Sequence, residues 1–139
     1  MTIEWEDSFN LGIADIDAQH QYFFRLIKAL GNTPKVVVGK QNINAHLLTE
    51  ISRHSLYHFA CEEELMMAYN YSGFSDHQKK HRELVEELRR KVEPIIAGNK
   101  SISKLRLFLY NWFTNHCTLD DKEYASHILS IRNKVFPVL

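Results

Sequence analysis

The sequence has few of the residues that break helices, with 5 glycines and 3 prolines among 139 residues. Since glycine and proline disfavour helix interiors most strongly, this composition is compatible with long helices. The sequence also has no excess of charge, with 17 basic and 17 acidic residues. Nucleic-acid-binding proteins usually carry a basic excess, so we expect no nucleic-acid partner. No apolar run approaches the roughly 20 residues of a membrane span, so we expect no such span.

Cysteine is scarce as well, and Cys61 and Cys117 form neither a disulfide framework nor a CxxC pair. Both lie within helical patterns, so we expect buried free thiols, which fit a reducing cytoplasm. The N-terminus is acidic and polar instead of basic and then apolar, and it therefore predicts no signal peptide.

Apolar residues recur at helical spacing in four main segments. The pattern predicts helices over about 17–30 and 41–69, a third that starts at an N-cap Ser75 and meets Pro94, and a fourth that Ser101 or Ser103 caps and that reaches His116. Stop signals follow at 31–34 and 98–99, residues 35–40 form a connection, and a short C-terminal helix is expected over about 121–133. Residues 1–14 read as an arm across the bundle. Together these features predict an all-α fold, an antiparallel up-down four-helix bundle, in a single domain over 1–139.

Histidines and carboxylates interrupt the apolar stripe of each predicted helix, where leucine, isoleucine, valine or phenylalanine is expected. Several of them stand four residues apart, and such residues lie on one helix face about one turn apart. Each pair can therefore reach one metal ion or two neighbouring ions. The interrupting residues are His20, His58, Glu62, His77, His81, His116, Asp120 and Asp121.

Burying all of these groups without partners costs too much for one domain. An unpaired buried polar group costs on the order of 1–3 kcal/mol, and a lone carboxylate costs several. The total stability of a domain is only about 5–15 kcal/mol. A single histidine in a stripe is most often an ordinary residue, and we interpret His46 and His127 in this way. Ligand-type side chains on all four helices instead predict a metal cluster that gives each group a partner.

The composition of this ligand set favours two ions. The absence of a cysteine set disfavours a structural zinc site, while imidazole with carboxylate suits iron, manganese, copper or zinc. Five histidines and two carboxylates are too many for one ion. If each of two ions takes about six ligands, and both carboxylates and one further oxygen bridge them, about one position stays open for a small ligand.

The ligand spacing resembles that of the haemerythrin family. The pattern consists of a lone histidine, then HxxxE, HxxxH and HxxxxD on successive helices. Further stretches that resemble bacterial haemerythrin extend the similarity over roughly residues 3–124. They are Ile3-Glu4-Trp5, Gly12-Ile13, Asp17-Ala18-Gln19-His20, His58-Phe59-Ala60-Cys61-Glu62-Glu63, Leu65-Met66 and Asp121-Lys122-Glu123-Tyr124.

The resemblance implies a non-haem centre of two iron ions with an oxo or hydroxo bridge. It also implies that molecular oxygen, or another small diatomic or anionic ligand, binds at the iron that keeps an open position. The implied ligands are His77, His81 and His116 on one iron, His20 and His58 on the other, and Glu62 and Asp121 as bridges.

The last bridging carboxylate has two candidates. In a regular helix, Asp120 at four residues from His116 is better placed, whereas the family pattern favours Asp121 at five residues, which requires a local bulge or a helix end. On the second helix, only Glu62 shares the face of His58, so we expect Glu63 and Glu64 to be surface charges.

A dry pocket is expected around the open position, because a stray proton would favour irreversible oxidation. The residues that we assign to its wall are Phe23, Phe24, Trp112, Phe113 and Cys117, although an ordinary core accounts for them equally well. His54 lies one turn before His58 on the same face. It is either a core or supporting histidine, or a residue that hydrogen-bonds near the open iron and tunes its oxidation.

Three functions are compatible with such a site. We favour a non-enzymatic oxygen transport, storage or delivery protein, because no second catalytic module is evident. The alternative is an oxygen- or redox-sensing domain of a larger bacterial signalling protein. A di-iron oxidase, peroxidase or nitric oxide reductase is disfavoured, because di-iron enzymes in helical bundles tend to be richer in carboxylates. The sequence indicates no particular protein partner.

Overall fold

All regular structure is helical in the computed structural model, which describes residues 3–31, 43–96 and 102–135. This confirms the all-α fold. The elements are a 3₁₀ turn at Asp7–Phe9, α1 (Ala14–Ala29), α2 (Ile43–Ala68), α3 (Phe74–Ile96), α4 (Ile102–Asn115), a π-helical segment at His116–Asp120, and α5 (Asp121–Val135).

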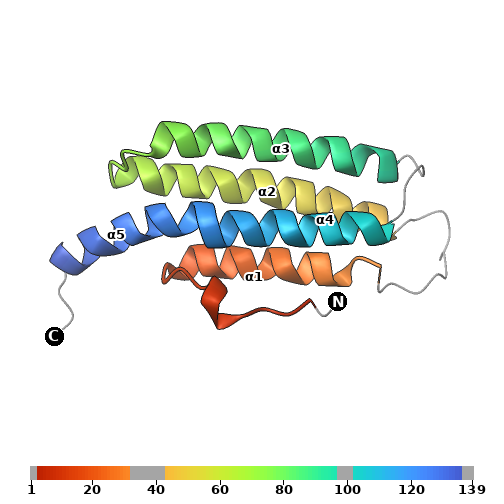
Figure 1. Ribbon diagram of the computed structural model, residues 1–139, viewed down its shortest axis with the longest axis horizontal. Coiled ribbons are helices and arrows are strands. Elements are labelled where there is room, and N and C mark those ends of the chain that lie inside the picture. Colours follow the sequence, from red (N-terminus) through yellow and green to blue (C-terminus); the bar gives the residue numbers. More distant parts are fainter. Residues whose placement is uncertain (1–2, 32–42, 97–101, 136–139) are drawn as a thin grey trace.

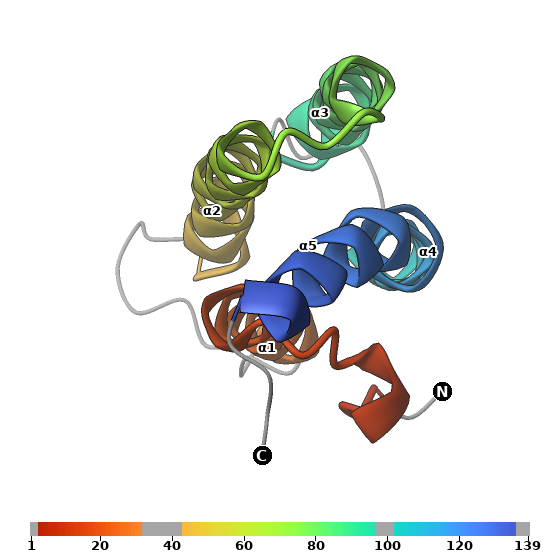
Figure 2. The same ribbon diagram turned by 90° about the vertical axis from the view of Figure 1, so that its left-hand side faces the viewer.

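The four long helical rods run up and down beside one another (Figure 1), and the expected four-helix bundle is confirmed. Viewed from one end, α1, α2, α3 and α4 occupy the four corners (Figure 2), and α1 and α3 each pack against α2 and α4. The π-helical segment joins α4 to α5 without a break, so the expected C-terminal helix is a continuation of the fourth rod that projects beyond the bundle.

Residues 3–13 form the expected arm beside α1. Phe9 and Leu11 are buried, and the Trp5 ring lies edge-on to Phe9 with 5.4 Å between ring centroids. The first helix begins at residue 14, earlier than expected, so Asp17 lies inside it. Its carboxylate accepts hydrogen bonds from the backbone N–H of Leu11 at 2.7 Å and of Gly12 at 3.1 Å. Gly12 has a φ of 90°, which glycine adopts without strain.

Two boundaries of the third helix differ from those expected. Ser75 is not the N-cap: the helix already includes Phe74, and the Gly73 carbonyl accepts a bond from the backbone N–H of His77. Pro94 does not end the helix, which runs to Ile96. Because a proline costs a helix mainly the bond from its missing N–H, its position in the last turn disrupts little that follows.

Some expected boundaries fall outside the described residues. These are the stop signal beyond residue 31, the connection at 35–40, the turn at 98–99 and the cap Ser101. Ser103, the alternative cap, lies within α4.

Two apolar clusters fill the bundle, and the polar residues lie between them. The larger cluster includes Phe23 and Leu109, and the smaller one includes Ile16 and Tyr124. Along α1, His20 stands between Ile16 of the smaller cluster and Phe23 of the larger. Burial of each large apolar side chain stabilises the fold by about 1.5–3 kcal/mol. The polar layer therefore lies between mainly apolar side chains on both sides.

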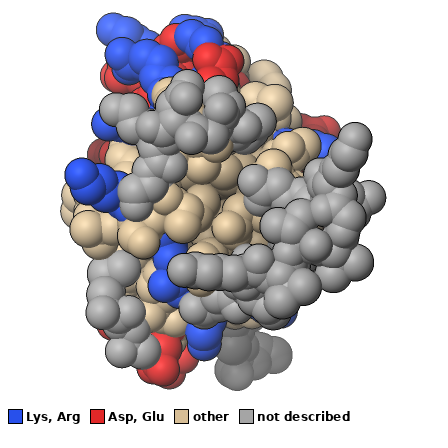
Figure 3. All heavy atoms as spheres, turned by 90° about the vertical axis from the view of Figure 1, so that its right-hand side faces the viewer, with Lys and Arg blue, Asp and Glu red and all other residues tan. Residues whose placement is uncertain are grey.

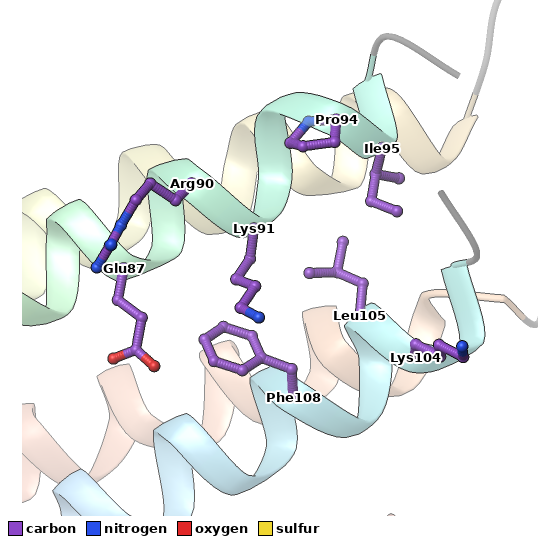
Figure 4. Close-up of a pocket in the computed structure, with 8 residues that line it drawn as sticks. All are labelled: Glu87, Arg90, Lys91, Pro94, Ile95, Lys104, Leu105 and Phe108. Atoms are coloured by element: carbon purple, nitrogen blue, oxygen red, sulfur yellow. The ribbon is translucent and has the colours of Figure 1, made fainter. Parts of the chain in front are cut away.

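A groove of about 550 Å³ lies between α3 and α4, and Figure 4 shows Lys91 and Ile95 of α3 pointing toward Phe108 and Leu105 of α4. Its floor is apolar, and the Lys91 ammonium group lies 5.4 Å from the centroid of the Phe108 ring. Lys91 follows His81 by ten residues on α3, which is about 15 Å at the helical rise. This groove is thus separate from the polar layer.

Charges of both signs appear on the described part of the bundle end shown in Figure 3, around a largely uncharged surface. None of the helices described here combines the length and the apolar character that crossing a membrane requires.

Truncation of a buried leucine tests this packing. Leu109→Ala should lower the free energy of unfolding by about 2–5 kcal/mol, because Leu109 is fully buried in the larger cluster. Leu107→Ala on the same helix is the matched control, since Leu107 is 47% exposed, and it should change stability by less than about 1 kcal/mol. Urea unfolding followed by circular dichroism measures both, and equal losses would contradict this packing.

Candidate metal centre

The five histidines and two carboxylates predicted from the sequence meet inside the bundle. They come from α1, α2, α3, the π-helical segment and the first residue of α5, and none is more than 7% exposed. They are His20, His58, Glu62, His77, His81, His116 and Asp121. Side chains that are far apart in the sequence therefore form one buried polar layer.

The ligand atoms fall into two groups that share both carboxylates, and within each group all atoms lie within 4.8 Å of one another. One group has His77, His81 and His116 with Glu62 and Asp121, and the other has His20 and His58 with the same two carboxylates. This geometry has the division that the family resemblance implied. The role of each residue on a particular ion stays a prediction.

In the three-histidine group, the Nε2 atoms face the carboxylates. Nε2 lies 3.1 Å from Asp121 Oδ1 in His77 and 3.0 Å from the same oxygen in His116. His81 Nε2 is 3.3 Å from Glu62 Oε1.

In the two-histidine group, His20 Nε2 is 3.2 Å from Asp121 Oδ2, and His58 Nε2 is 3.0 Å from Glu62 Oε1. The Nε2 atoms of His20 and His58 are 3.0 Å apart. Adjacent ligand atoms on an octahedral ion with bonds of about 2.1 Å are separated by about 3.0 Å. The spacing of these two nitrogens therefore suits ligands of one ion.

Most of the atoms that face the centre have no hydrogen-bond partner among the described residues. Their short contacts are not aligned as hydrogen bonds. The unpartnered atoms are Nε2 of His77, His81 and His116 and both carboxylate oxygens of Glu62 and Asp121. Each such buried group costs on the order of 1–3 kcal/mol if unpaired. Two metal ions between the groups would coordinate all of these atoms, so the residues present fit a di-iron centre.

The π-helical segment decides between the two aspartates. Its wider turn places Asp121, five residues after His116, in the buried layer, and the side chain of Asp121 is 0% exposed. Asp120 points to the outer side of the same histidine, where its Oδ2 lies 3.0 Å from His116 Nδ1. Asp120 is thus more than a solvated neighbour of the site. A π-bulge at a functional site is a recurrent feature of helices.

Two residues that the sequence did not single out as site residues hold two of these histidines from outside. His58 Nδ1 donates to Gln19 Oε1 at 2.7 Å, and His81 Nδ1 donates to Glu63 Oε2 at 2.9 Å. The expectation that Glu63 is a surface charge is wrong, because the side chain is only 19% exposed. Glu64 is exposed, as expected. Metal-binding histidines commonly donate their second N–H to a carboxylate or carbonyl oxygen. This general preference is the one signal that could have pointed to Gln19 and Glu63 from the sequence.

Both central carboxyls are ionised. Burial opposes ionisation of Glu62, but the neighbouring histidines, chiefly His58, hold the pKa of its carboxyl well below its usual value. Burial and the charge of Glu62 likewise oppose ionisation of Asp121, whose contacts with His116 and His20 nevertheless lower its pKa to about 2. The centre therefore presents two anions to a cation pair.

Apolar and aromatic side chains line the centre on the α1 and α4 sides. Phe113 lies edge-on to His20 at 5.5 Å between centroids and stacks on Phe23 at 4.9 Å. Cys117 is buried, and burial together with the nearby carboxylates raises the pKa of its thiol well above the usual value. The Trp112 ring centroid lies 5.8 Å from that of Phe23. Phe24 contacts Trp5 and Tyr110 instead, so its place in the wall stays a prediction.

His54 is half-buried and does not belong to either ligand group. Its Nε2–H donates to the backbone carbonyl of Gln19 at 3.0 Å, and its ring lies nearly parallel to that of His58, 6.3 Å away. His54 therefore supports the residue that holds His58. The supporting-residue interpretation fits this position.

Tyr124 is a third residue that the sequence did not single out as a site residue. Its ring is edge-on to His77 at 5.3 Å, and its hydroxyl is buried without a hydrogen-bond partner among the described residues. Burial, reinforced by the charges of Glu62 and Asp121, raises the pKa of this phenol, which keeps it neutral.

The chain is similar to known proteins in sequence and in fold. The family model described as "Hemerythrin HHE cation binding domain" matches residues 11–139. Identity is 29% over 131 residues with the bacteriohemerythrin of Stenotrophomonas maltophilia (strain R551-3), covering 94% of this chain and 84% of that protein. It is 26% over 124 residues with the myohemerythrin of Riftia pachyptila, covering 89% and 92%. A crystal structure of wild-type hemerythrin has a TM-score of 0.79 at 23% identity, over 92% of this chain and 98% of that one, which supports the fold.

Metal uptake by the apoprotein tests the site. Two iron(II) ions should bind per chain without oxygen and, at a hundredfold excess of free iron over each dissociation constant, stabilise the fold by about 2.7 kcal/mol per ion, or about 5 kcal/mol together. Glu62→Gln should lose most of this gain, because Glu62 belongs to both ligand groups. The matched control Glu64→Gln should retain it, since Glu64 is exposed. Thermal unfolding with and without iron measures the gain, and an undiminished gain in Glu62→Gln would refute the site.

Proposed function

The chain belongs to the haemerythrin family, and from this premise we propose that it binds molecular oxygen reversibly at its di-iron centre, for transport, storage or delivery. The observation that carries the proposal is the buried pair of ligand groups that share Glu62 and Asp121. Bacteriohemerythrin and myohemerythrin relatives, which match most of the chain, support it.

We propose that each residue of the two groups binds iron directly. His77, His81 and His116 would hold one ion together with the carboxylates, whereas the second ion would have His20 and His58 with the same carboxylates, which leaves room for a small ligand. Two iron(II) ions held there would supply the electrons that oxygen binding requires. The protein's task is then to orient the ions, to admit a small ligand and to keep water away.

The aromatic wall serves this last task. Phe113 covers His20, and Phe23 stacks behind it, so the two-histidine side faces apolar surface. Cys117 beside this surface keeps its proton, because its pKa is raised. A site without readily lost protons disfavours irreversible oxidation.

We further propose that the protein has no catalytic turnover of its own. Its centre has five histidines and only two carboxylates, and so would give less negative charge to the ions than the carboxylate-rich sites of di-iron enzymes in bundles. Highly oxidised iron is accordingly less stabilised. A reducing compartment such as the cytoplasm fits the two free cysteines.

Oxygen titration of the iron(II)-loaded protein tests the function. Oxygen should bind at up to one molecule per two irons and leave again when the gas phase is replaced by argon, with the optical spectrum returning to its starting form over several cycles. Immediate oxidation that argon does not reverse would count against a carrier role and favour sensing or chemistry.

A wall variant sharpens this test. Phe113→Leu should speed irreversible oxidation on the order of tenfold, equivalent to about 1.4 kcal/mol in the barrier, because it opens space beside His20. Leu107→Ala is the control, since Leu107 lies on the same helix but is 47% exposed. Equal oxidation rates in the two variants would contradict the proposal that the aromatic wall slows irreversible oxidation.

A further inference from the structure

The outer partners of the ligating histidines differ in charge between the two halves of the centre. On the two-histidine side, His58 Nδ1 donates to the neutral amide oxygen of Gln19 at 2.7 Å. On the three-histidine side, His81 donates to the Glu63 carboxylate at 2.9 Å and His116 to the Asp120 carboxylate at 3.0 Å. The fold thus gives one half two anionic acceptors and the other half none of this kind.

His20, the other histidine of the two-histidine side, increases this difference in outer partners. His20 Nδ1 is buried and has no hydrogen-bond partner among the described residues. The imidazole of His20 therefore gains no electron density from an acceptor behind it. His58 gains only what a neutral amide provides.

The two outer carboxylates belong to Glu63 and Asp120. Glu63 Oε1 accepts a bond from Gln78 Nε2 at 2.8 Å, so one oxygen is held by α3 while the other holds His81. Asp120 ends the π-helical segment, directly before Asp121, and its Oδ2 lies 3.0 Å from His116 Nδ1. Each outer carboxylate is the sequence neighbour of a shared central carboxylate, so Glu62–Glu63 and Asp120–Asp121 each supply one inner and one outer group.

An anionic acceptor strengthens a histidine as a ligand. It draws the Nδ1 proton toward itself, which raises the electron density and the basicity of Nε2, and it locks the ring in the orientation that binds metal. Such hydrogen bonds to a charged group are roughly twice as strong as those to a neutral group. Loss of an outer partner typically costs 10–100-fold in metal affinity.

We propose that Glu63 and Asp120 are positioning residues that make the three-histidine site the tighter of the two, so that the ions load in order: first beside His77, His81 and His116, then beside His20 and His58. This inference rests on the proposed di-iron function. According to this inference, Glu63 and Asp120 cause the difference in metal affinity between the two sites.

Anaerobic titration of the apoprotein with iron(II) alone, followed by calorimetry, tests the order of loading. The unmodified chain should show two steps of one ion each, separated by at least about tenfold in dissociation constant. Glu63→Gln and Asp120→Asn should each weaken the first step about 10–100-fold and change the second by less than about threefold. Gln19→Glu should tighten the second step selectively.

Two controls assign the steps to sites. Glu64→Gln, an exposed neighbour, should leave both steps unchanged. His81→Leu should abolish the tighter step, whereas His58→Leu should abolish the weaker one. Circular dichroism of each apoprotein verifies folding, and because Asp120 is 32% exposed, Asp120→Asn is the variant that carries the test if Glu63→Gln does not fold.

The possible outcomes distinguish a failure of this inference from a failure of the proposed di-iron function. Uptake of one ion or none by the unmodified chain would defeat the proposed di-iron function itself. Uptake of two ions in one unresolved step would overturn the inference alone. So would a loss in Glu63→Gln or Asp120→Asn that falls equally on both steps, which is what a merely structural role produces.

Discussion

The fold depends on one constraint: anionic and imidazole groups from α1, α2, α3, the π-helical segment and α5 face each other at its centre, and most of their inward atoms have no hydrogen-bond partner among the described residues. Left so, these groups would cancel much of the stability that a domain has. Cations between them change the sign of the contribution, because every inward nitrogen and oxygen then has a partner. Metal binding and the stability of the bundle are therefore coupled.

The rest of the structure keeps this layer in place. Two apolar clusters enclose it along the bundle axis, so that water has little access from either end. The π-helical segment has a wider turn than an α-helix, so Asp121 faces the centre while Asp120 lies on the outer side of His116. The Asp17 carboxylate ties the arm to α1 three residues before His20. Regular secondary structure thus carries the ligands, and one local irregularity completes the set.

The sequence predicted the features that follow from periodicity. His58 with Glu62, and His77 with His81, stand out because four-residue spacing places them on a stripe that is otherwise apolar. Asp121 could not be obtained in this way, since a regular helix favours Asp120, and the family pattern was needed. The roles of Gln19 and Glu63 were missed because their partners, His58 and His81, lie on other helices. Pro94 misled because the helix completes its last turn beyond the proline and ends two residues later, at Ile96.

Crystallography of the iron-loaded protein with anomalous scattering at the iron edge tests the central claim most directly. The account predicts two iron peaks within about 4 Å of each other, both in contact with Glu62 and Asp121, one beside His77, His81 and His116 and the other beside His20 and His58. A single peak, or iron bound away from these seven side chains, would contradict it.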